Sequence, residues 1–363
     1  MGKPMTDREV TRLRLSNQAL SRPRFSKPAD AVGWLGAVQA QDFAGAKWAV
    51  GARMRAATDA AVERTFNAGS ILRTHILRPT WHFVVPADIR WMLDLTAPRV
   101  KAGLASRRRQ LGLDARMLKR SNAALERALR DGALLTRDEL REVLGRAGIA
   151  AEGVRMAHIM GHAELDGIVC SGPRRGKQFT YALLDAQAPA GPALTREEAL
   201  ARLAGRYFAS RGPATPHDFA KWASLTLDDA RRGLEGVEGD LRRDVVEGAT
   251  YWSFGAMPSA GAAGARALLL SLFDEYIGSY RDRSAIVAPE HAPKLWAGNA
   301  VTHVLLLDGK IVGTWRRRLA VKAVNVELRF FDPPTRAATR AMAEAARRYA
   351  AFLGLPLTLA DAR

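Results

Sequence analysis

Two glutamines separated by one alanine form the most distinctive polar group near the start of the chain. Gln39, Ala40 and Gln41 precede Asp42 in the otherwise apolar stretch GWLGAVQAQDFAGAKWAV. Apolar residues at helical spacing over 28–41 predict a helix that ends here. Residues i and i+2 do not share a helix face, but at a helix end both amides can turn toward one point. Such a pair can hold a water molecule and a ligand edge without charge; two ordinary helix-end glutamines are the alternative.

Two further groups of residues have spacings that suggest chemistry. The stretch LFDEYIGSYRDRS, residues 272–284, interleaves acids with bases and is typical of a salt-bridged loop. The alternative is a hydrolase in which Asp274 and Glu275 divide the acid and base roles, which requires them to have very different pKa values. His158 and His162 have the spacing of a helical metal pair, but isoleucine follows the first histidine where zinc peptidases have glutamate. We therefore expect packing or phosphate-facing histidines and no metal.

The charge balance indicates a polyanion as partner. A net charge of +18 arises from 55 basic and 37 acidic residues, and the basic residues are clustered. A strong, clustered excess is the electrostatic footprint of a nucleic-acid binder; an arginine-rich genome composition is the alternative. The residues for which we expect DNA contacts are Arg73, His75, Arg78, Trp81, His82, Arg107, Arg108, Arg109, Arg174, Arg175, Lys177, Arg316 and Arg317.

Several function classes are excluded by sequence features that are missing. The chain has no Walker loop, no glycine-rich dinucleotide fingerprint followed by an acid, no GxSxG and no CxxC, which argues against phosphoryl and hydride transfer. Its single cysteine, Cys170, excludes an internal disulfide framework and fits a reducing compartment. No run of 18 apolar residues is present to span a bilayer. We expect a bacterial, cytoplasmic, nucleoid-associated monomer that needs no cofactor and contacts no membrane.

The elements that must position these residues repeat one plan. Helical patterns followed by a run of β-branched and aromatic residues predict a winged helix for residues 1–98, with the ribbon at 71–85. The same order recurs in 99–190, where Thr136 begins a helix with a capping box, and again in 191–255. The sequence therefore predicts three tandem winged-helix units.

The last part of the chain, 256–363, has a different pattern. It begins with a Gly/Ala/Ser/Pro stretch at 255–265 of the kind that separates domains. Two strand-like runs around Asp308 and Gly309 predict a hairpin, more strand pattern follows, and a helix closes the chain. We expect a small β barrel with one covering helix, and an α+β fold overall.

Four stretches of the sequence resemble the AlkZ/YcaQ family of winged-helix DNA glycosylases, namely WLGAVQAQDFAGAKWAVGAR, RTHILRPTWHFV, RGPATPHDFAKWASL, and LFDEYIGSYRDR followed by DGKIVGTWRRR. The resemblance covers nearly the whole chain and implies three tandem winged helices in a C shape with a C-terminal β barrel. In the AlkZ branch a Gln-x-Gln motif is the catalytic element, whereas the YcaQ branch has Gln-x-Asp. The resemblance therefore assigns catalysis to Gln39 and Gln41, with Asp42 as an accessory. Ala40 is smaller than the aliphatic residue expected between the glutamines.

The resemblance implies hydrolysis of the N-glycosidic bond of N7- or N3-alkylated purines in damaged double-stranded DNA. It also implies unhooking of interstrand crosslinks and self-resistance to an alkylating natural product. An alkylated purine already carries positive charge and leaves without a general acid, so two amides that orient water are sufficient. The hairpin at Asp308 and Gly309 is expected near the minor groove. The alternative is a non-catalytic winged-helix binder or transcriptional regulator, for which the same folds and charges suffice.

Overall fold

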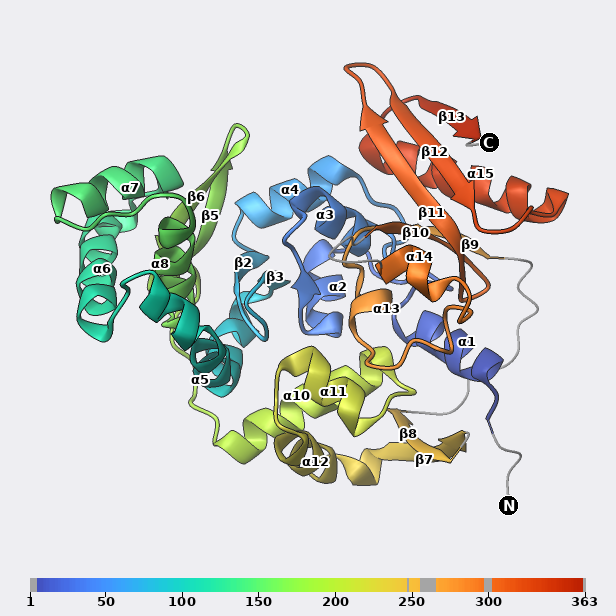
Figure 1. Ribbon diagram of the computed structural model, residues 1–363, viewed down its shortest axis with the longest axis horizontal. Helices are drawn as coiled ribbons and strands as arrows, with labels where there is room; N and C mark the ends of the chain where they lie inside the picture. The colour runs from blue at the N-terminus through green and yellow to red at the C-terminus, as the bar shows by residue number, and fades with distance from the viewer. Residues whose placement is uncertain (1–4, 247, 255–265, 297–301, 362–363) are drawn as a thin grey trace.

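The computed structural model describes residues 5–246, 248–254, 266–296 and 302–361 (Figure 1). Three groups of helices, each followed by an antiparallel strand pair, precede a C-terminal sheet with its own helices. No helix in these ranges is long and apolar enough to cross a membrane. The predicted separating stretch, 255–265, lies outside the described residues.

The first group of helices surrounds the Gln-x-Gln segment. Its elements are α1 (Asp7–Asn17), α2 (Pro28–Leu35), β1 (Val38–Gln39), α3 (Phe43–Gly51), α4 (Asp59–Asn67), β2 (Leu72–His75) and β3 (Trp81–Val84). The helix predicted over 28–41 is wrong in its second half. It ends at Leu35 because Gly36 takes a φ of 71°, and β1 then pairs antiparallel with β3.

The second group shares a sheet with the first. Its elements are α5 (Pro86–Gln110), α6 (Ala115–Ala128), the 3₁₀ turn η1 (Arg130–Gly132), β4 (Leu135–Thr136), α7 (Arg137–Arg146), α8 (Gly153–Leu165), β5 (Val169–Arg175), β6 (Gln178–Leu183) and α9 (Leu184–Gln187). The capping box of Thr136 and Glu139 is confirmed at the start of α7. One six-stranded sheet has the order β1-β3-β2-β5-β6-β4, with Arg73 of β2 opposite Ser171 of β5. The two groups are therefore joined through their strands.

The third group packs beneath the first in the view of Figure 1. It consists of α10 (Arg196–Arg211), α11 (Pro216–Ala223), α12 (Leu227–Glu235), the 3₁₀ turn η2 (Glu238–Asp240) and the hairpin β7 (Leu241–Val246) and β8 (Ala249–Phe254). The predicted cap by Thr195 is confirmed, because its hydroxyl accepts from Glu198 N–H. Apolar residues of α10 and α11 join those of α5 in one buried cluster. That shared core fixes the third group against the long helix α5.

The C-terminal part is an open sheet. Its elements are β9 (Ala267–Leu270), α13 (Glu275–Gly278), α14 (Ala292–Trp296), β10 (His303–Leu307), β11 (Lys310–Leu319), β12 (Val324–Phe330), α15 (Arg336–Leu353) and β13 (Leu357–Asp361). The predicted β barrel is wrong: the strand order is β13-β12-β11-β10-β9, and within the described residues the two end strands do not pair. The predicted hairpin at Asp308 and Gly309 is confirmed, with Leu307 opposite Lys310.

The C-terminal sheet is anchored to the helix that follows the Gln-x-Gln segment. Trp48 of α3 donates its indole N–H to the Leu269 carbonyl of β9 at 2.6 Å and packs on Tyr349 and Phe352 of α15. Gly51 of α3 leaves room for the Phe352 ring, since an added Cβ would lie 2.5 Å from it. In Figure 1 the β5–β6 hairpin and the β11–β12 hairpin stand on opposite sides of the first group.

Candidate active site

The Gln-x-Gln segment is a strand edge rather than a helix end. Gln39 of β1 lies opposite His82 of β3, and the pairing continues because Ala40 N–H donates to the Trp81 carbonyl at 2.7 Å. β1 ends at Gln39, and Gln41 lies in the bend that follows, where its N–H donates to the side-chain Oε1 of Gln39 at 3.3 Å. Gln39 is 9% exposed, whereas Gln41 in the bend is exposed. One amide is thus held inside the protein and the other faces outward.

A buried acid holds the backbone of the first glutamine. Glu275 of α13 is fully buried, and its Oε1 accepts Gln39 N–H at 2.9 Å. Its Oε2 accepts from Arg211 Nη2 at 2.7 Å, Trp222 Nε1 at 2.8 Å and Ser279 Oγ at 3.0 Å. Burial alone would raise the pKa of Glu275, but the charges of Arg211 and Arg78 and the hydrogen bond from Arg211 together outweigh burial and lower the pKa to about 2. Glu275 is therefore an ionised positioning group that is buried and held by donors on both of its oxygens.

The environment of the two acids excludes the paired-carboxylate hydrolase. Asp274 is 1% exposed and forms a two-oxygen contact with the buried Arg53, at 2.9 Å for each oxygen. Glu275 is 0% exposed and saturated by donors. A hydrolase of that kind needs one acid with a raised pKa beside open solvent. The acids instead tie the C-terminal part to the first and third groups of helices.

A stack of side chains that begins at Arg73 holds the backbone of Ala40. Arg73 is 5% exposed, donates Nε–H to the Ala40 carbonyl at 3.0 Å, and lies over the Trp81 ring. Trp81 also packs against His75, with ring centroids 4.5 Å apart. Glu164 of α8 receives the Trp81 indole N–H at 3.2 Å and contacts Nδ1 of His75. The second group of helices therefore supports the strand that carries the glutamines.

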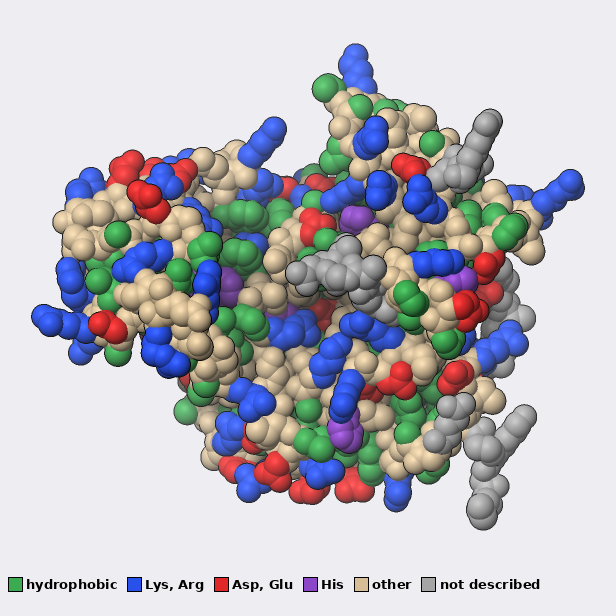
Figure 2. Space-filling view, in the orientation of Figure 1, with side chains coloured by type: hydrophobic (Ala, Val, Ile, Leu, Met, Phe, Trp, Pro, Cys, Tyr) green, Lys and Arg blue, Asp and Glu red, His purple; other side chains and the backbone are tan. Residues whose placement is uncertain are grey.

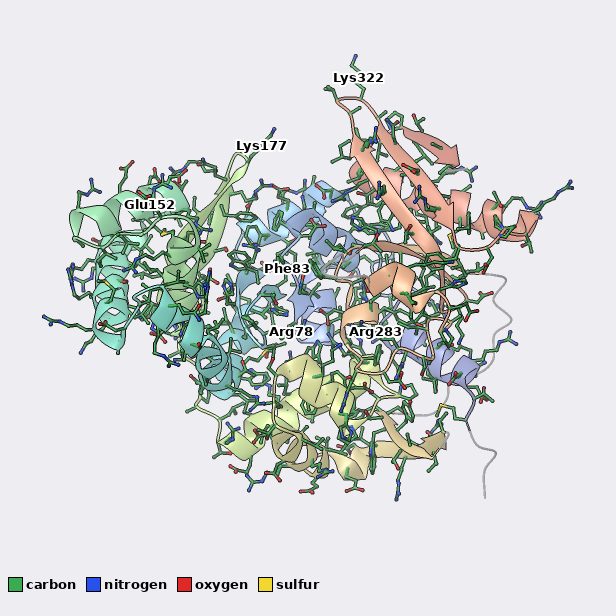
Figure 3. The ribbon with its side chains drawn as sticks, viewed as in Figure 1. Arg78, Phe83, Glu152, Lys177, Arg283 and Lys322 are labelled. Carbon is green, nitrogen blue, oxygen red and sulfur yellow. The ribbon has the colours of Figure 1, made fainter. Side chains whose placement is uncertain are left out.

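Next to Gln39, a neutral histidine and an arginine form the other side of the site. Arg78 donates Nη2–H to His82 Nε2 at 3.0 Å, and His82 Nδ1 lies 2.9 Å from the Thr80 carbonyl. Burial and the charge of Arg78 lower the pKa of His82 to about 3, so its ring is neutral at pH 7. Arg78 lies near the middle of the face in Figure 3 and bonds the Trp222 carbonyl at 3.2 Å. A cation is thus fixed beside the motif.

Asp42 turns toward the C-terminal sheet. Its Oδ2 lies 3.9 Å from Arg317 Nη2 of β11, and it makes no capping bond at the start of α3. His303 of β10 lies nearby in the field of both groups; burial and Arg317 lower its pKa to about 4. Asp42 is half-buried, so a carboxylate borders the outward side of the motif.

The residues predicted to contact DNA fall into three sets by exposure. Arg73, His82 and Arg108 are buried. The exposed members are Arg107, Arg109, Arg175, Lys177 and Arg316, and the half-buried members are His75, Arg78, Trp81, Arg174 and Arg317. Figure 2 shows Lys and Arg side chains spread over the second group of helices, the centre of the face and the C-terminal sheet. The cations are therefore distributed around the motif rather than gathered at it.

One histidine of the α8 pair, His162, and the turn at Gly309 have protein partners. His162 Nε2 lies 3.1 Å from Asp166 Oδ2. Among the described residues, no three His, Cys, Asp or Glu side chains are grouped so that they could hold a metal ion. Gly309 is packed against Thr11 of α1 and its carbonyl accepts the Tyr276 hydroxyl, so this turn is not free to enter a DNA groove. That correction follows from tertiary packing that the hairpin pattern does not contain.

Sequence reasoning did not find the residues that hold the motif. The sequence predicts that Glu275 belongs to a salt-bridged loop or to a paired-carboxylate site, and it does not indicate Arg211 or Trp222 as its partners. The signal available was the acid at position 275 within an apolar stretch, since a charge between apolar residues is typically buried only when paired. Its partners lie in α10 and α11 and could not be identified without the fold.

Comparison with known proteins gives consistent matches. The family model described as DNA glycosylase AlkZ-like matches residues 32–352. A relative from Streptomyces sahachiroi, named interstrand DNA cross-link repair glycosylase, is 29% identical over 351 residues, covering 88% of this chain and 94% of the relative. The solved structure of Streptomyces sahachiroi DNA glycosylase AlkZ matches with a TM-score of 0.80 and 25% identity over 99% of this chain and 100% of that chain. The family match includes Gln39, Gln41 and Glu275.

Proposed function

Because the chain belongs to the AlkZ-like DNA glycosylase family, we propose that it hydrolyses the N-glycosidic bond of N7- or N3-alkylated purines in damaged double-stranded DNA. Purines joined in an interstrand crosslink are included, in line with the name of the relative from Streptomyces sahachiroi. The observation that carries the proposal is the fixed strand edge of Gln39 and Gln41. Glu275 holds its first N–H, while Trp81 and Arg73 hold both backbone groups of Ala40.

The chemistry needs positioning more than proton transfer. An alkylated purine is cationic and departs as a neutral base, so no acid is required to protonate it. Gln39 and Gln41 orient the attacking water on the sugar, and their uncharged amides do not repel the cationic base. Asp42 is the accessory, because its half-buried carboxylate can stabilise positive charge that develops on the sugar. Preorganised groups of this kind act without reorganising when the bond breaks.

DNA is proposed to lie across the face that carries the motif. We infer that residues 1–98, 99–190 and 191–255 are three tandem winged-helix units, which form a C-shaped arrangement together with residues 256–363. We also infer that the protein is a monomer that acts on the bacterial nucleoid in the cytoplasm. Lys177 and Lys322 project from the tips of two hairpins on either side of the first group (Figure 3). Val321, beside Lys322, is 95% exposed, and an exposed apolar residue next to a cation is suited to wedge into a minor groove.

Contacts to the DNA backbone are proposed for the predicted DNA-binding residues whose side chains reach solvent. They are His75, Arg78, Trp81, Arg107, Arg109, Arg174, Arg175, Lys177, Arg316 and Arg317. Arg73, His82 and Arg108 are buried, so for the first two we propose support of the motif rather than direct contact. Contacts to phosphate set register and affinity without reading sequence, which suits an enzyme that searches for damage.

The test is release of free base from duplex DNA. One substrate contains a single N7-methylguanine and the other a bis-N7-guanine crosslink, with an undamaged duplex as control. Release of methylguanine, leaving an abasic site that breaks in alkali, is the expected result. Conversion of the crosslinked species to separated strands tests the crosslink activity. Tight binding to all three duplexes without release from either damaged substrate would contradict the proposed function and favour a non-catalytic binder.

A further inference from the structure

A groove of about 1040 Å³ runs between α5 of the second group and α11 of the third. Its floor is apolar and includes Val100, Leu104 and Leu225. Gly103, in the middle of α5, lines it without a side chain, and an added Cβ there would meet no atom within 4 Å. The groove is therefore open at Gly103 and offers an apolar surface against which a deoxyribose could pack.

The groove is bordered by positive charge. The cations that line it are Arg99 of α5, Lys221 of α11 and Arg281 after α13; the imidazole of His217 lies beside them, and no Asp or Glu is among the described residues that line it. All four are exposed. Within the part of the chain that the structure describes, the side chains of Arg99 and Arg281 have no ion-pair partner. Cations that lack an acidic partner and surround an apolar surface are suited to bind an anion that is attached to an apolar group.

The electrostatic potential at Lys221 also favours a bound anion. Its ammonium group donates to the Tyr280 carbonyl at 2.7 Å. Burial of that group, with Arg283 and Arg78 close by, lowers the pKa of Lys221 to about 8, although Asp218 acts in the opposite direction. A second anion beside Lys221 would relieve this unfavourable positive potential. Figure 3 shows Arg78 and Arg283 near the centre of the same face.

The groove adjoins the candidate active site through two residues. Pro79 lines the groove and directly follows Arg78, which bonds His82 opposite Gln39. Lys221 directly precedes Trp222, whose indole N–H bonds Glu275. An anion in the groove therefore lies next to the backbone of whatever nucleotide occupies the motif.

We propose that the groove between α5 and α11 binds one phosphate of the DNA backbone adjacent to the nucleotide held at Gln39 and Gln41. This inference rests on the proposed function for the identity of that nucleotide, but not for the phosphate contact itself. The third group of helices then contributes directly to DNA binding, through residues Lys221 and His217. None of the groove cations is among the individual residues for which the sequence predicted DNA contacts.

The experiment measures affinity for an undamaged duplex as a function of salt. Lys221→Gln removes the charge while keeping a donor for the Tyr280 carbonyl, and Arg99→Gln removes an exposed charge from the other wall. Arg340→Gln, which removes an exposed charge from α15, is the matched control. Each groove variant is expected to weaken binding and to reduce the slope of log affinity against log salt by about 0.9 for the lost phosphate contact. Equal slopes for the groove variants and the control would overturn the proposal.

A second pair of variants tests the groove without removing charge. Gly103→Leu places a side chain in the open space and favours helix, so the fold is expected to persist. Gly103→Ala is its control. Leu is expected to weaken duplex binding by blocking the groove, whereas Ala leaves most of it open. Unchanged binding by Gly103→Leu, with the circular dichroism of the wild type, would exclude a backbone in the groove.

Two further measurements distinguish free phosphate from DNA-backbone phosphate, and distinguish failure of the groove proposal from failure of the glycosylase proposal. In the first, inorganic phosphate is titrated into the protein and its binding is followed by changes in the amide NMR shifts. If free phosphate saturates the groove but Lys221→Gln has no effect on duplex binding, the groove is a site for free anions and the assignment to the DNA backbone is overturned. The duplex is undamaged, so the binding result stands even if no base is released from alkylated DNA. A wrong glycosylase proposal would thus appear in the base-release assay, and a wrong groove proposal in the duplex-binding assay.

Discussion

Replacing Glu275 by Gln tests whether the Gln39 strand depends on the acid that holds it. The amide has one acceptor oxygen and one NH2 group in place of two acceptor oxygens. If the amide oxygen of the new glutamine faces Arg211 and Trp222, its NH2 group faces the Gln39 N–H. If the amide is turned round, its NH2 group faces the guanidinium of Arg211 instead. Either orientation opposes two donors in a fully buried site. The variant therefore combines a shifted motif with a buried arginine that has lost its ion-pair partner.

The magnitudes follow from those two losses. Removing one partner of a buried ion pair costs about 3–5 kcal/mol of unfolding free energy, and Arg211 keeps the Leu35 and Ala37 carbonyls as partial compensation. We expect a loss near the lower end, about 3 kcal/mol. A displacement of the motif by about 1 Å is expected to slow base release by about 100-fold.

The assay pairs urea unfolding with single-turnover release of methylguanine at a temperature where the proteins are folded. Asp274→Asn is the matched control, because Asp274 is equally buried and paired with Arg53 but does not touch the motif. It should lose similar stability and keep the wild-type rate, while Glu275→Gln loses rate with duplex affinity unchanged. Equal rates for Glu275→Gln and the wild type, or equal loss in both variants, would refute a positioning role for Glu275.

Three further predictions concern groups around the site. His82 has its pKa lowered from 6.5 to about 3 by burial and Arg78, so only the unfolded chain binds this proton between those pH values; stability should fall as pH drops below 6.5 by about 1.4 kcal/mol per unit, and His82→Gln should remove that part of the slope in urea unfolding. Burial raises the pKa of Cys170 to about 12, so a thiolate-selective disulfide reagent should react at pH 8 only after denaturation, and rapid native reaction would contradict its burial. Gly51→Leu drives a side chain into the Phe352 ring and should cost about 1–3 kcal/mol in urea unfolding, whereas wild-type stability would show that α15 does not pack on α3 as described.

Local signals in the sequence were sufficient for helix starts and one turn. Thr136 and Thr195 cap their helices as predicted, because a capping box depends on residues three positions apart. The hairpin at Asp308 and Gly309 likewise depends on adjacent residues. Such features need no knowledge of distant parts of the chain.

The errors concern pairings between distant residues. The strand at Gln39 is two residues long and exists because β3 pairs with it, so no alternating pattern could reveal it inside an apolar stretch. Barrel closure depends on whether the end strands β9 and β13 meet, which hairpin patterns do not specify. The motif itself was predicted from its amides, but its support by Glu275 comes from three helices that only the fold brings together.

The most direct test of the central claim is single-turnover base release by wild type, Gln39→Ala and Gln41→Ala on a duplex with one N7-methylguanine. Binding to the same duplex is measured alongside, so that loss of chemistry is separated from loss of affinity. If the fixed amides carry the reaction, each variant should release methylguanine at least about 100-fold more slowly while binding the duplex as the wild type does. Release at the wild-type rate by both variants would contradict the assignment of catalysis to this strand.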